Sequence, residues 1–461
     1  MKISKITIFT FIFPLMLWGC KTTSKPADVK PDIALPSSYS LDVNDRTISD
    51  TPWWHSLERP TLNRLISQSL GNNYDIKQAI ARVDQARALT RQTESDLYPK
   101  IDALAEGNRE WEGSDGQRGT ARLGVNLQWE IDAFNRIRNA TKADIAETTA
   151  RVEDVKALKL FTSIEVANAY FSAVAAQQTL DLLNQQVQTD KDLLELLELR
   201  FDQGIGTNVE VLQQKSRVTE SLSLIPVAQS QRRVSENRLD VLMGHAPDGQ
   251  NRVTEDETLD FTASLPRVSV PADILVNRPD IRAAKAALIA ADFDTAEAIA
   301  NRLPQITLDG SYLLSDNAAY SGPVSMIMGT FVAPLLDWGQ RKAEVERNEA
   351  VYQERLAAFT QLYIEAVGDV ENALYQENRQ RDFLERLDQR RIVLDKTVQE
   401  TEARYGQGID DYLPVLNALQ ELRQVERAII SERLNLIALR ISLYSAIGGA
   451  ITPSTHPEEL L

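Results

Sequence analysis

A segment of alternating side chains, Ala121 to Asp132, places the strongest limit on the fold. Its odd positions are apolar, and its even positions are polar or charged apart from Gly124. This period of two is typical of a strand with one apolar face. A strand in a soluble protein usually has about 5–6 residues, whereas a strand tilted across a bilayer needs about 9–11. The segment has the longer length, which predicts a strand that crosses a membrane.

Three further segments share the pattern. We expect one hairpin from strands at about 99–111 and 120–132, and a second from strands at about 304–315 and 323–336. Four strands cannot close a membrane barrel, because the smallest barrels have about eight and an open edge leaves backbone groups unpaired in lipid. The chain is therefore expected to share one barrel with other copies, and three copies of four strands would give twelve.

The first residues predict export and a lipid anchor. A basic start, an apolar run from Ile6 to Trp18 and Gly19 are typical of a signal peptide over residues 1–19. The only cysteine of the chain, Cys20, follows directly and resembles the acylated cysteine of a bacterial lipobox. Lys21, where an aspartate would retain a lipoprotein in the inner membrane, points to the outer membrane. An incidental cysteine in an ordinary signal peptide is the alternative.

The sequence repeats itself at an offset of 204 or 205 residues. For example, Asp75-Ile76 recurs as Asp280-Ile281, and Arg200-Phe201 recurs as Arg404-Tyr405. Each half is expected to contain a short helix, a hairpin, a very long helix, a tight turn and a second short helix. The predicted organisation is a tether with the lipid anchor at 20–60, a first repeat at 61–244, an equatorial insertion at 245–270, a second repeat at 271–449 and a tail at 450–461.

Long helices dominate the predicted secondary structure. Residues 135–200 contain neither proline nor glycine, so they can form one helix of about 100 Å, and residues 340–404 behave similarly. Apolar residues at a spacing of three and four predict coiled-coil seams. In the first helix the seam is Leu180, Leu183, Val187, Leu194, Leu197 and Phe201, interrupted by Asp190. A second seam runs from Leu422 to Leu443 and is interrupted by Glu432.

Two kinds of junction recur in the halves. Gly204 and Gly206 in the first half, and Gly408 in the second, follow the long helices, as left-handed C-terminal caps do, and should start helical hairpins. At the strand-to-helix junctions, Asp132 recurs with Arg136, and Asp337 recurs with Arg341. We expect each Asp and Arg to form a local ion pair that also caps the helix.

Residues that could make this chain an enzyme are missing from the sequence. His55, His245 and His456 lack the spacing of metal ligands, and no dinucleotide or phosphate loop is present. The net charge of -16, without blocks of Lys and Arg, argues against a nucleic-acid partner. We therefore expect no catalytic residues, no cofactor and no metal.

Several motifs, in order from about residue 50 to 450, carry a family resemblance. They are Trp53-Trp54, Gln85-Ala86-Arg87, Trp129-Glu130-Ile131-Asp132, Asn277-Arg278-Pro279-Asp280, Pro334-Leu335-Leu336-Asp337 and Arg404-Tyr405-Gly406-Gln407-Gly408. With them the chain resembles the TolC-like outer-membrane efflux factor family, in its NodT/OprM-like lipoprotein branch. The resemblance implies a mainly α protein that forms a homotrimer, with a 12-stranded β-barrel in the outer membrane and a 12-helix α-barrel in the periplasm.

The resemblance also implies a function. The trimer would be the outer-membrane channel of a tripartite efflux system, a passive exit duct for small molecules loaded by an inner-membrane transporter of the RND type through a periplasmic adaptor. Tip turns at Gly204, Gly206 and Gly408 would contact that adaptor. In this family, hydrophobic and acidic side chains near the last turn close the channel. Here Leu413 holds the hydrophobic position, and Asn417 stands where an aspartate is common. Asp410 and Asp411 would supply charge nearer the tip, although helix capping by either residue is an equally good interpretation.

Two other functions remain open from the sequence. A duct for type I protein secretion shares every feature described above. A pore-less periplasmic coiled-coil adaptor or scaffold shares the helices and the lipid anchor, but it has no need of four strands of bilayer length.

Overall fold

The computed structural model describes residues 39, 52–111, 117–260, 278–316 and 320–449. The described chain divides into two compact units that alternate along the sequence. The sheet unit contains Thr90–Asp144 and Ile289–Gln353, and the helical unit contains Lys30–Leu89, Ile145–Leu288 and Glu354–Leu461. Cys20, the signal peptide, most of the tether and the tail at 450–461 lie outside the described residues, and the bounds of the two repeats stay a prediction.

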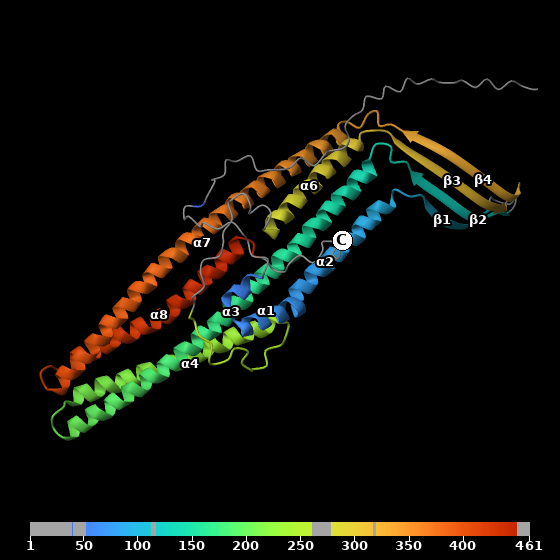
Figure 1. The fold of residues 1–461 in the computed structure, drawn as a ribbon. Coiled ribbons are helices and arrows are strands. Elements are labelled where there is room, and N and C mark those ends of the chain that lie inside the picture. The colour runs from blue at the N-terminus through green and yellow to red at the C-terminus, as the bar shows by residue number, and fades with distance from the viewer. Residues whose placement is uncertain (1–38, 40–51, 112–116, 261–277, 317–319, 450–461) are drawn as a thin grey trace, which may run out of the picture. The chain divides into compact units, whose positions relative to one another are not determined.

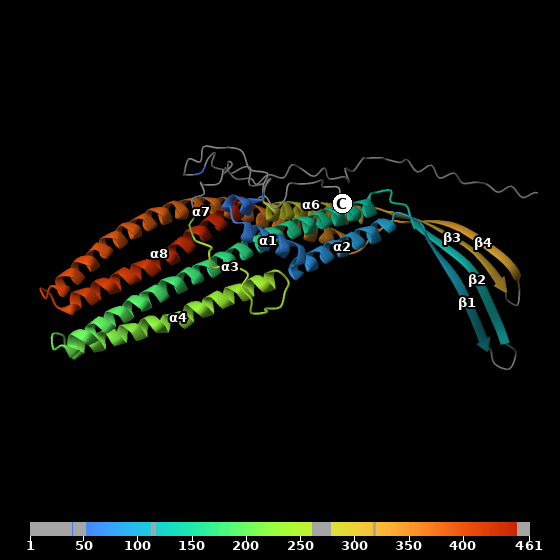
Figure 2. The same ribbon diagram turned by 60° about the horizontal axis from the view of Figure 1, so that its bottom comes forward.

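Four strands form one antiparallel sheet in the order β1-β2-β3-β4 (Figure 1). The strands are β1 (Lys100–Trp111), β2 (Gln117–Glu130), β3 (Gln305–Asp316) and β4 (Ser321–Val332). All four bend in the same direction, as the rotated view shows (Figure 2). The four predicted strands are confirmed, but β4 ends at Val332 and not at 336. Pro334 follows shortly after, and proline has no N–H for a ladder hydrogen bond.

The register places most apolar side chains of β1, β2 and β3 on one face together with Ile327 and Phe331 of β4, whereas Val324, Met326, Met328 and Val332 of β4 lie on the other face. Leu123 pairs with Leu314, Val125 with Tyr312 and Ile306 with Phe331, so the alternation of β2 agrees with that of β3. Many of these side chains are exposed in the single chain, including Ile101, Leu123, Tyr312, Leu314, Ile327 and Phe331. A soluble surface rarely presents so many apolar groups together. The sheet therefore has one continuous apolar face of the kind that contact with lipid requires.

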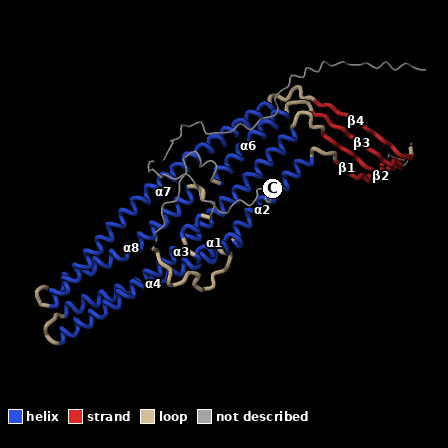
Figure 3. The backbone as a smooth tube through the Cα atoms, viewed as in Figure 1, coloured by secondary structure: helices blue, strands red, loops and turns tan. Residues whose placement is uncertain are grey.

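Seven α-helices were assigned in the described chain (Figure 3). They are α1 (Pro60–Asn72), α2 (Tyr74–Ser95), α3 (Arg136–Asp202), α4 (Asn208–Leu242), α6 (Pro279–Ala300), α7 (Gln340–Gly406) and α8 (Tyr412–Ala446). The two predicted long helices are confirmed as α3 and α7, each of 67 residues. None of the helices in the described part of the chain combines the length and apolar character needed to span a bilayer.

The main core of the helical unit is built around aromatic residues from both ends of the chain. Trp53 and Trp54 are buried in the short 3-10 helix η1 (Trp53–Leu57). The Trp53 ring stacks on that of Tyr444 at 5.3 Å, and its Nε1 donates to Ser163 Oγ at 3.0 Å. The prediction of an extended tether up to residue 60 is therefore wrong for its last part, because the two tryptophans fold into the core.

The predicted coiled-coil seam of α3 is largely confirmed. Leu180, Leu183, Val187 and Leu197 are buried, and Asp190 is completely buried among them. Phe201 is the exception, because it is 43% exposed and does not belong to the seam. It lies in the last turn of α3, where the chain turns back.

Gly124 in β2 provides a test of the sheet. A Cβ atom there would lie 2.1 Å from the Tyr312 backbone oxygen and 2.7 Å from the Leu313 Cα, so Gly124→Ala must push β2 away from β3. We expect a loss of about 1–3 kcal/mol in the free energy of unfolding. Thermal unfolding of the detergent-solubilised protein, followed by circular dichroism, measures it. Gly107→Ala is the matched control, since nothing lies within 4 Å of that position; equal stability of the two variants would contradict the pairing of β2 with β3.

Candidate functional site

The turns that join α3 to α4 and α7 to α8 have the same backbone structure. In the first, Gly204 adopts a φ of 72°, Ile205 N–H donates to Arg200 O at 3.0 Å, and Gly204 N–H donates to Phe201 O at 2.9 Å. In the second, Gly408 adopts a φ of 71°, with the same two bonds from Ile409 and Gly408. This is the Schellman motif, in which a glycine ends the helix in the left-handed conformation. The predicted caps are thus confirmed at Gly204 and Gly408.

Gly206 has a different role from the predicted left-handed cap. It does not adopt a positive φ, but a Cβ atom there would lie 3.2 Å from the Phe201 backbone nitrogen, so the close approach of the chain restricts the position. Thr207 follows and forms a capping box with Glu210, in which Thr207 N–H donates to Glu210 Oε2 at 2.8 Å. The first turn is therefore held by both of the helices that it joins.

Asp410 and Asp411 do not cap α8 with their side chains. Asp411 is the N-cap residue, but its carboxylate accepts no capping hydrogen bond. Asp410 instead accepts from Arg404 Nε at 2.5 Å and from Arg404 Nη2 at 3.2 Å. The Arg404 guanidinium holds the pKa of Asp410 below its usual range, so this carboxylate stays ionised and its charge is partly compensated. The capping interpretation is wrong because Arg404, on the preceding helix, is the nearer partner.

Leu413 and Asn417 lie one turn apart on the exposed face of α8. Leu413 is 54% exposed, and Asn417 is also exposed, whereas their neighbours Tyr412 and Val415 are buried. The two predicted gate residues therefore point away from the core of their own chain. The exposed Leu413 side chain is therefore available for contact with another molecule or another copy of the chain.

The buried face of this part of α8 belongs to a cluster that we call the tip core. Side chains from α3, α4, α7 and α8 make up this cluster: Leu197, Val211, Val398, Tyr405, Tyr412, Val415, Ala418, Leu419 and Leu422. The Tyr405 and Tyr412 rings lie 5.5 Å apart, and the Arg200 guanidinium lies 4.6 Å from the Tyr405 ring centre. Burial raises the pKa of Tyr412, so its hydroxyl keeps its proton at neutral pH. The tip core packs the two helical turns against each other.

A buried polar group, which we call the Asp190 network, joins α3, α4 and α8. Asp190 is fully buried; it accepts from Ser221 Oγ at 2.8 Å and from Gln214 Nε2 at 3.1 Å, and it pairs with the Arg423 guanidinium. Tyr412 O–H completes the network by donating to Gln214 Oε1 at 2.6 Å. None of these partners was predicted from the sequence. The signal that could have revealed them was the acidic residue that interrupts an otherwise apolar seam.

The strand-to-helix junctions differ in detail. Asp337 forms the predicted ion pair with Arg341 at 3.2 Å and accepts from the backbone N–H of Gly339 and Arg341. At the other junction, the predicted pair of Asp132 with Arg136 is wrong. Arg136 binds Glu130 with two hydrogen bonds of 3.0 and 2.8 Å.

Asp132 still caps its helix, as predicted. Its carboxylate accepts from the N–H groups of Ile137 and Arg138 at the start of α3, and it lies 3.4 Å from the Arg138 guanidinium. Asn135, with a φ of 59°, turns the chain between the strand and the helix. This turn places the Asp132 carboxylate next to the first N–H groups of α3. Arg136 then forms its ion pair with Glu130 of β2.

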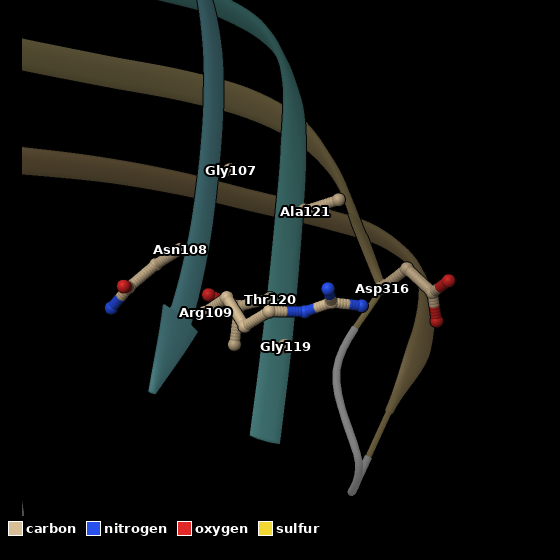
Figure 4. A pocket seen from close by; sticks show the side chains of 7 residues that line it. All are labelled: Gly107, Asn108, Arg109, Gly119, Thr120, Ala121 and Asp316. Atoms are coloured by element: carbon tan, nitrogen blue, oxygen red, sulfur yellow. The ribbon is translucent and has the colours of Figure 1, made fainter. Parts of the chain in front are cut away.

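The structure offers little that could bind a metal or a cofactor. Within the residues that it describes, no group of three or more His, Cys, Asp or Glu side chains is placed to hold a metal ion. A hollow of about 430 Å³ lies at one end of the sheet, where the Arg109 side chain extends toward Asp316 (Figure 4). Residues of β1 and β2 and Asp316 of β3 line it, and the hollow is open to the surface and not an enclosed binding site.

Comparison with known proteins gives consistent matches over nearly the whole chain. A family model described as outer membrane efflux protein matches residues 65–245 and 270–449. The pyoverdine export outer membrane protein OpmQ of Pseudomonas putida is 28% identical over 458 residues, which cover 94% of this chain and 95% of OpmQ. The cation efflux system protein CusC of Escherichia coli K12 is 27% identical over 465 residues, which cover 97% and 100%. The solved structure of the outer-membrane channel OprN superposes with a TM-score of 0.82 at 25% identity, and the match covers 91% of this chain and 99% of that one.

Two glycines at the end of α7 should respond to alanine in opposite directions. Gly408→Ala forces a side chain into a left-handed backbone and should lower the free energy of unfolding by about 1–2 kcal/mol. Gly406→Ala, at the last helical residue with nothing within 4 Å, should raise it by up to about 1 kcal/mol. Thermal unfolding of both variants measures the difference. A stable Gly408→Ala variant would contradict the left-handed cap.

Proposed function

This chain belongs to the outer membrane efflux protein family, and we propose that it releases small molecules through a channel whose periplasmic end is closed at Leu413. The chain is the outer-membrane channel component of a tripartite efflux system and is not an enzyme. Channels of this family work with a periplasmic adaptor and an inner-membrane pump.

The sheet supports a barrel shared by three copies. β1 and β4 are the two edges of the described sheet, and its apolar face is exposed in the single chain. In lipid the edges need partners, because no water is available to satisfy their backbone groups. We infer that β4 of one copy pairs with β1 of the next, so that three copies close a barrel of twelve strands.

A ring of Leu413 side chains is the proposed barrier. The exposure of the Leu413 side chain supports this barrier, because Leu413 is 54% exposed although the preceding residue, Tyr412, is buried. In a trimer, three such side chains from symmetric positions would narrow the channel with apolar surface, which excludes water and hydrated ions. Asn417, one turn further along α8, would line the next level, and Asp410 would add a charge that Arg404 partly compensates.

Opening requires two packing states of the helical hairpins. An adaptor that binds the open state more tightly than the closed state would shift the balance toward opening. The turn residues Ile205 and Ile409, 62% and 57% exposed beside Gly204 and Gly408, are the apolar groups that we propose for adaptor contact.

We further propose that the inner-membrane pump is of the RND type and that a lipid attached to Cys20 anchors the chain in the outer membrane.

The cargo is proposed only as a class, namely small molecules. OpmQ and CusC are named for pyoverdine export and cation efflux, and this chain is almost equally identical to both. A passive duct contributes its width, its surface charge and its gate, whereas the pump that loads it selects the cargo. The net charge of the protein is -16, and a negative charge favours cations over anions near its surface.

Replacing the gate residue tests the proposal. Leu413→Ser should increase the conductance of the purified trimer in planar bilayers several-fold, because a small polar side chain at this level both widens the opening and allows it to hydrate. Leu89→Ser is the matched control, since Leu89 on α2 is 53% exposed, almost the same as Leu413, and should leave the conductance unchanged. Wild-type conductance in Leu413→Ser would remove this residue from the gate.

A further inference from the structure

We propose that Asp190 and Arg423 are positioning residues of the gate, which hold the start of α8 at one fixed level against α3 and α4. This inference rests on the proposed function, because it concerns the level at which Leu413 projects. Asp190 is the residue that interrupts the apolar seam of α3, and it is fully buried. An acidic side chain at such a position calls for an explanation, since burying a charge is costly unless it is paired and hydrogen-bonded.

The first arm of the network reaches the residue beside the gate. Gln214 of α4 donates from its Nε2 to Asp190 Oδ1 at 3.1 Å and to the Asp190 backbone oxygen at 2.8 Å. The Oε1 of the same amide accepts from Tyr412 O–H at 2.6 Å, and Gln214 is itself fully buried. Tyr412 is the first residue of α8 and directly precedes Leu413. One glutamine side chain therefore connects the Asp190 carboxylate to the start of the gate helix.

The second arm fixes the same helix three turns further along. The Arg423 guanidinium, 5% exposed, pairs with Asp190 Oδ1, while Ser221 of α4 donates to Oδ2. Tyr412 and Arg423 are separated along α8 by about 16 Å at 1.5 Å per residue. A helix bound at two such points can neither slide along its neighbours nor rotate about its own axis without breaking a buried hydrogen bond. The level and the direction of Leu413 are thereby set.

Stability alone does not explain these residues. The positions that surround Asp190 in the seam are apolar, and replacing a buried ion pair by apolar side chains of similar size is often neutral or stabilising. A buried polar group in a coiled coil is better known for fixing the register of the helices. We therefore assign the Asp190 network to alignment and the surrounding apolar seam to stability.

A second buried ion pair in the helical unit provides the matched control. Glu377 of α7 and Arg440 of α8 are both fully buried and pair with each other, and Arg381 also binds Glu377 at 3.0 Å. Glu377 accepts hydrogen bonds from Arg381 and Arg440, both of which lie far along the helices from the first turn of α8. Arg440 lies 28 residues after Tyr412 on α8. Replacing Arg440 should therefore leave the level of Leu413 unchanged.

The experiment compares two double variants of the full-length trimer. Asp190→Leu with Arg423→Met should keep the melting temperature within a few degrees of wild type. Its conductance in planar bilayers should nevertheless rise several-fold, because α8 loses its fixed level. Glu377→Leu with Arg440→Met should change the conductance little. A wild-type conductance for the first double variant, or an equal rise for both, would overturn the inference.

A milder variant covers the case in which the first double variant does not fold. Tyr412→Phe removes only the hydroxyl that binds Gln214 and leaves the ring in the tip core. It should raise the conductance to a smaller extent with an almost unchanged melting temperature, and no rise would overturn the inference. Leu413→Ser is measured in parallel. If Leu413→Ser leaves the conductance unchanged while the other variants raise it, the gate assignment has failed. If Leu413→Ser raises the conductance while the other variants do not, only the positioning role has failed.

Discussion

An unpaired strand edge in a hydrocarbon environment is the constraint on which the rest of this structure depends. β1 and β4 end the described sheet on its two sides, and apolar side chains cover one of its faces. Lipid supplies no hydrogen bonds to exposed backbone groups, so an open sheet of this kind is not stable there. Other copies of the chain must close the sheet, and the central channel is the geometric consequence of that closure.

The internal duplication gives two helical turns with one backbone design and different surroundings. Gly204 and Gly408 end their helices with the same pair of hydrogen bonds. The residues that follow diverge, with a capping box at Thr207 in one turn and the Asp410 pair with Arg404 in the other. An exposed apolar side chain follows each turn, Val209 at the start of α4 and Leu413 at the start of α8, and we place the proposed gate at Leu413.

Local pattern predicted much of this fold, and tertiary contacts decided the rest. The strands, the two long helices and the left-handed glycines were predictable because each depends on a short stretch of sequence with a fixed period or a fixed backbone angle. The pairing of Arg136 with Glu130 was missed because Asn135 turns the chain there. Asp190 was visible as a break in the seam, but Arg423 lies 233 positions away, and only the folded chain brings the two together.

A gate made of helices has to be stable in its closed state and still able to move. Apolar seams stabilise the packed helices but do not fix their register, because leucine packs almost as well after a small slide as before it. Buried hydrogen bonds have direction and lose most of their value when the partners shift. The Asp190 network acts on the same helix that carries Leu413, so we propose that a few polar bonds define the closed level of the gate. In our proposal an opening motion then has a small and specific set of contacts to exchange, while the long apolar seams keep the helices of each chain packed.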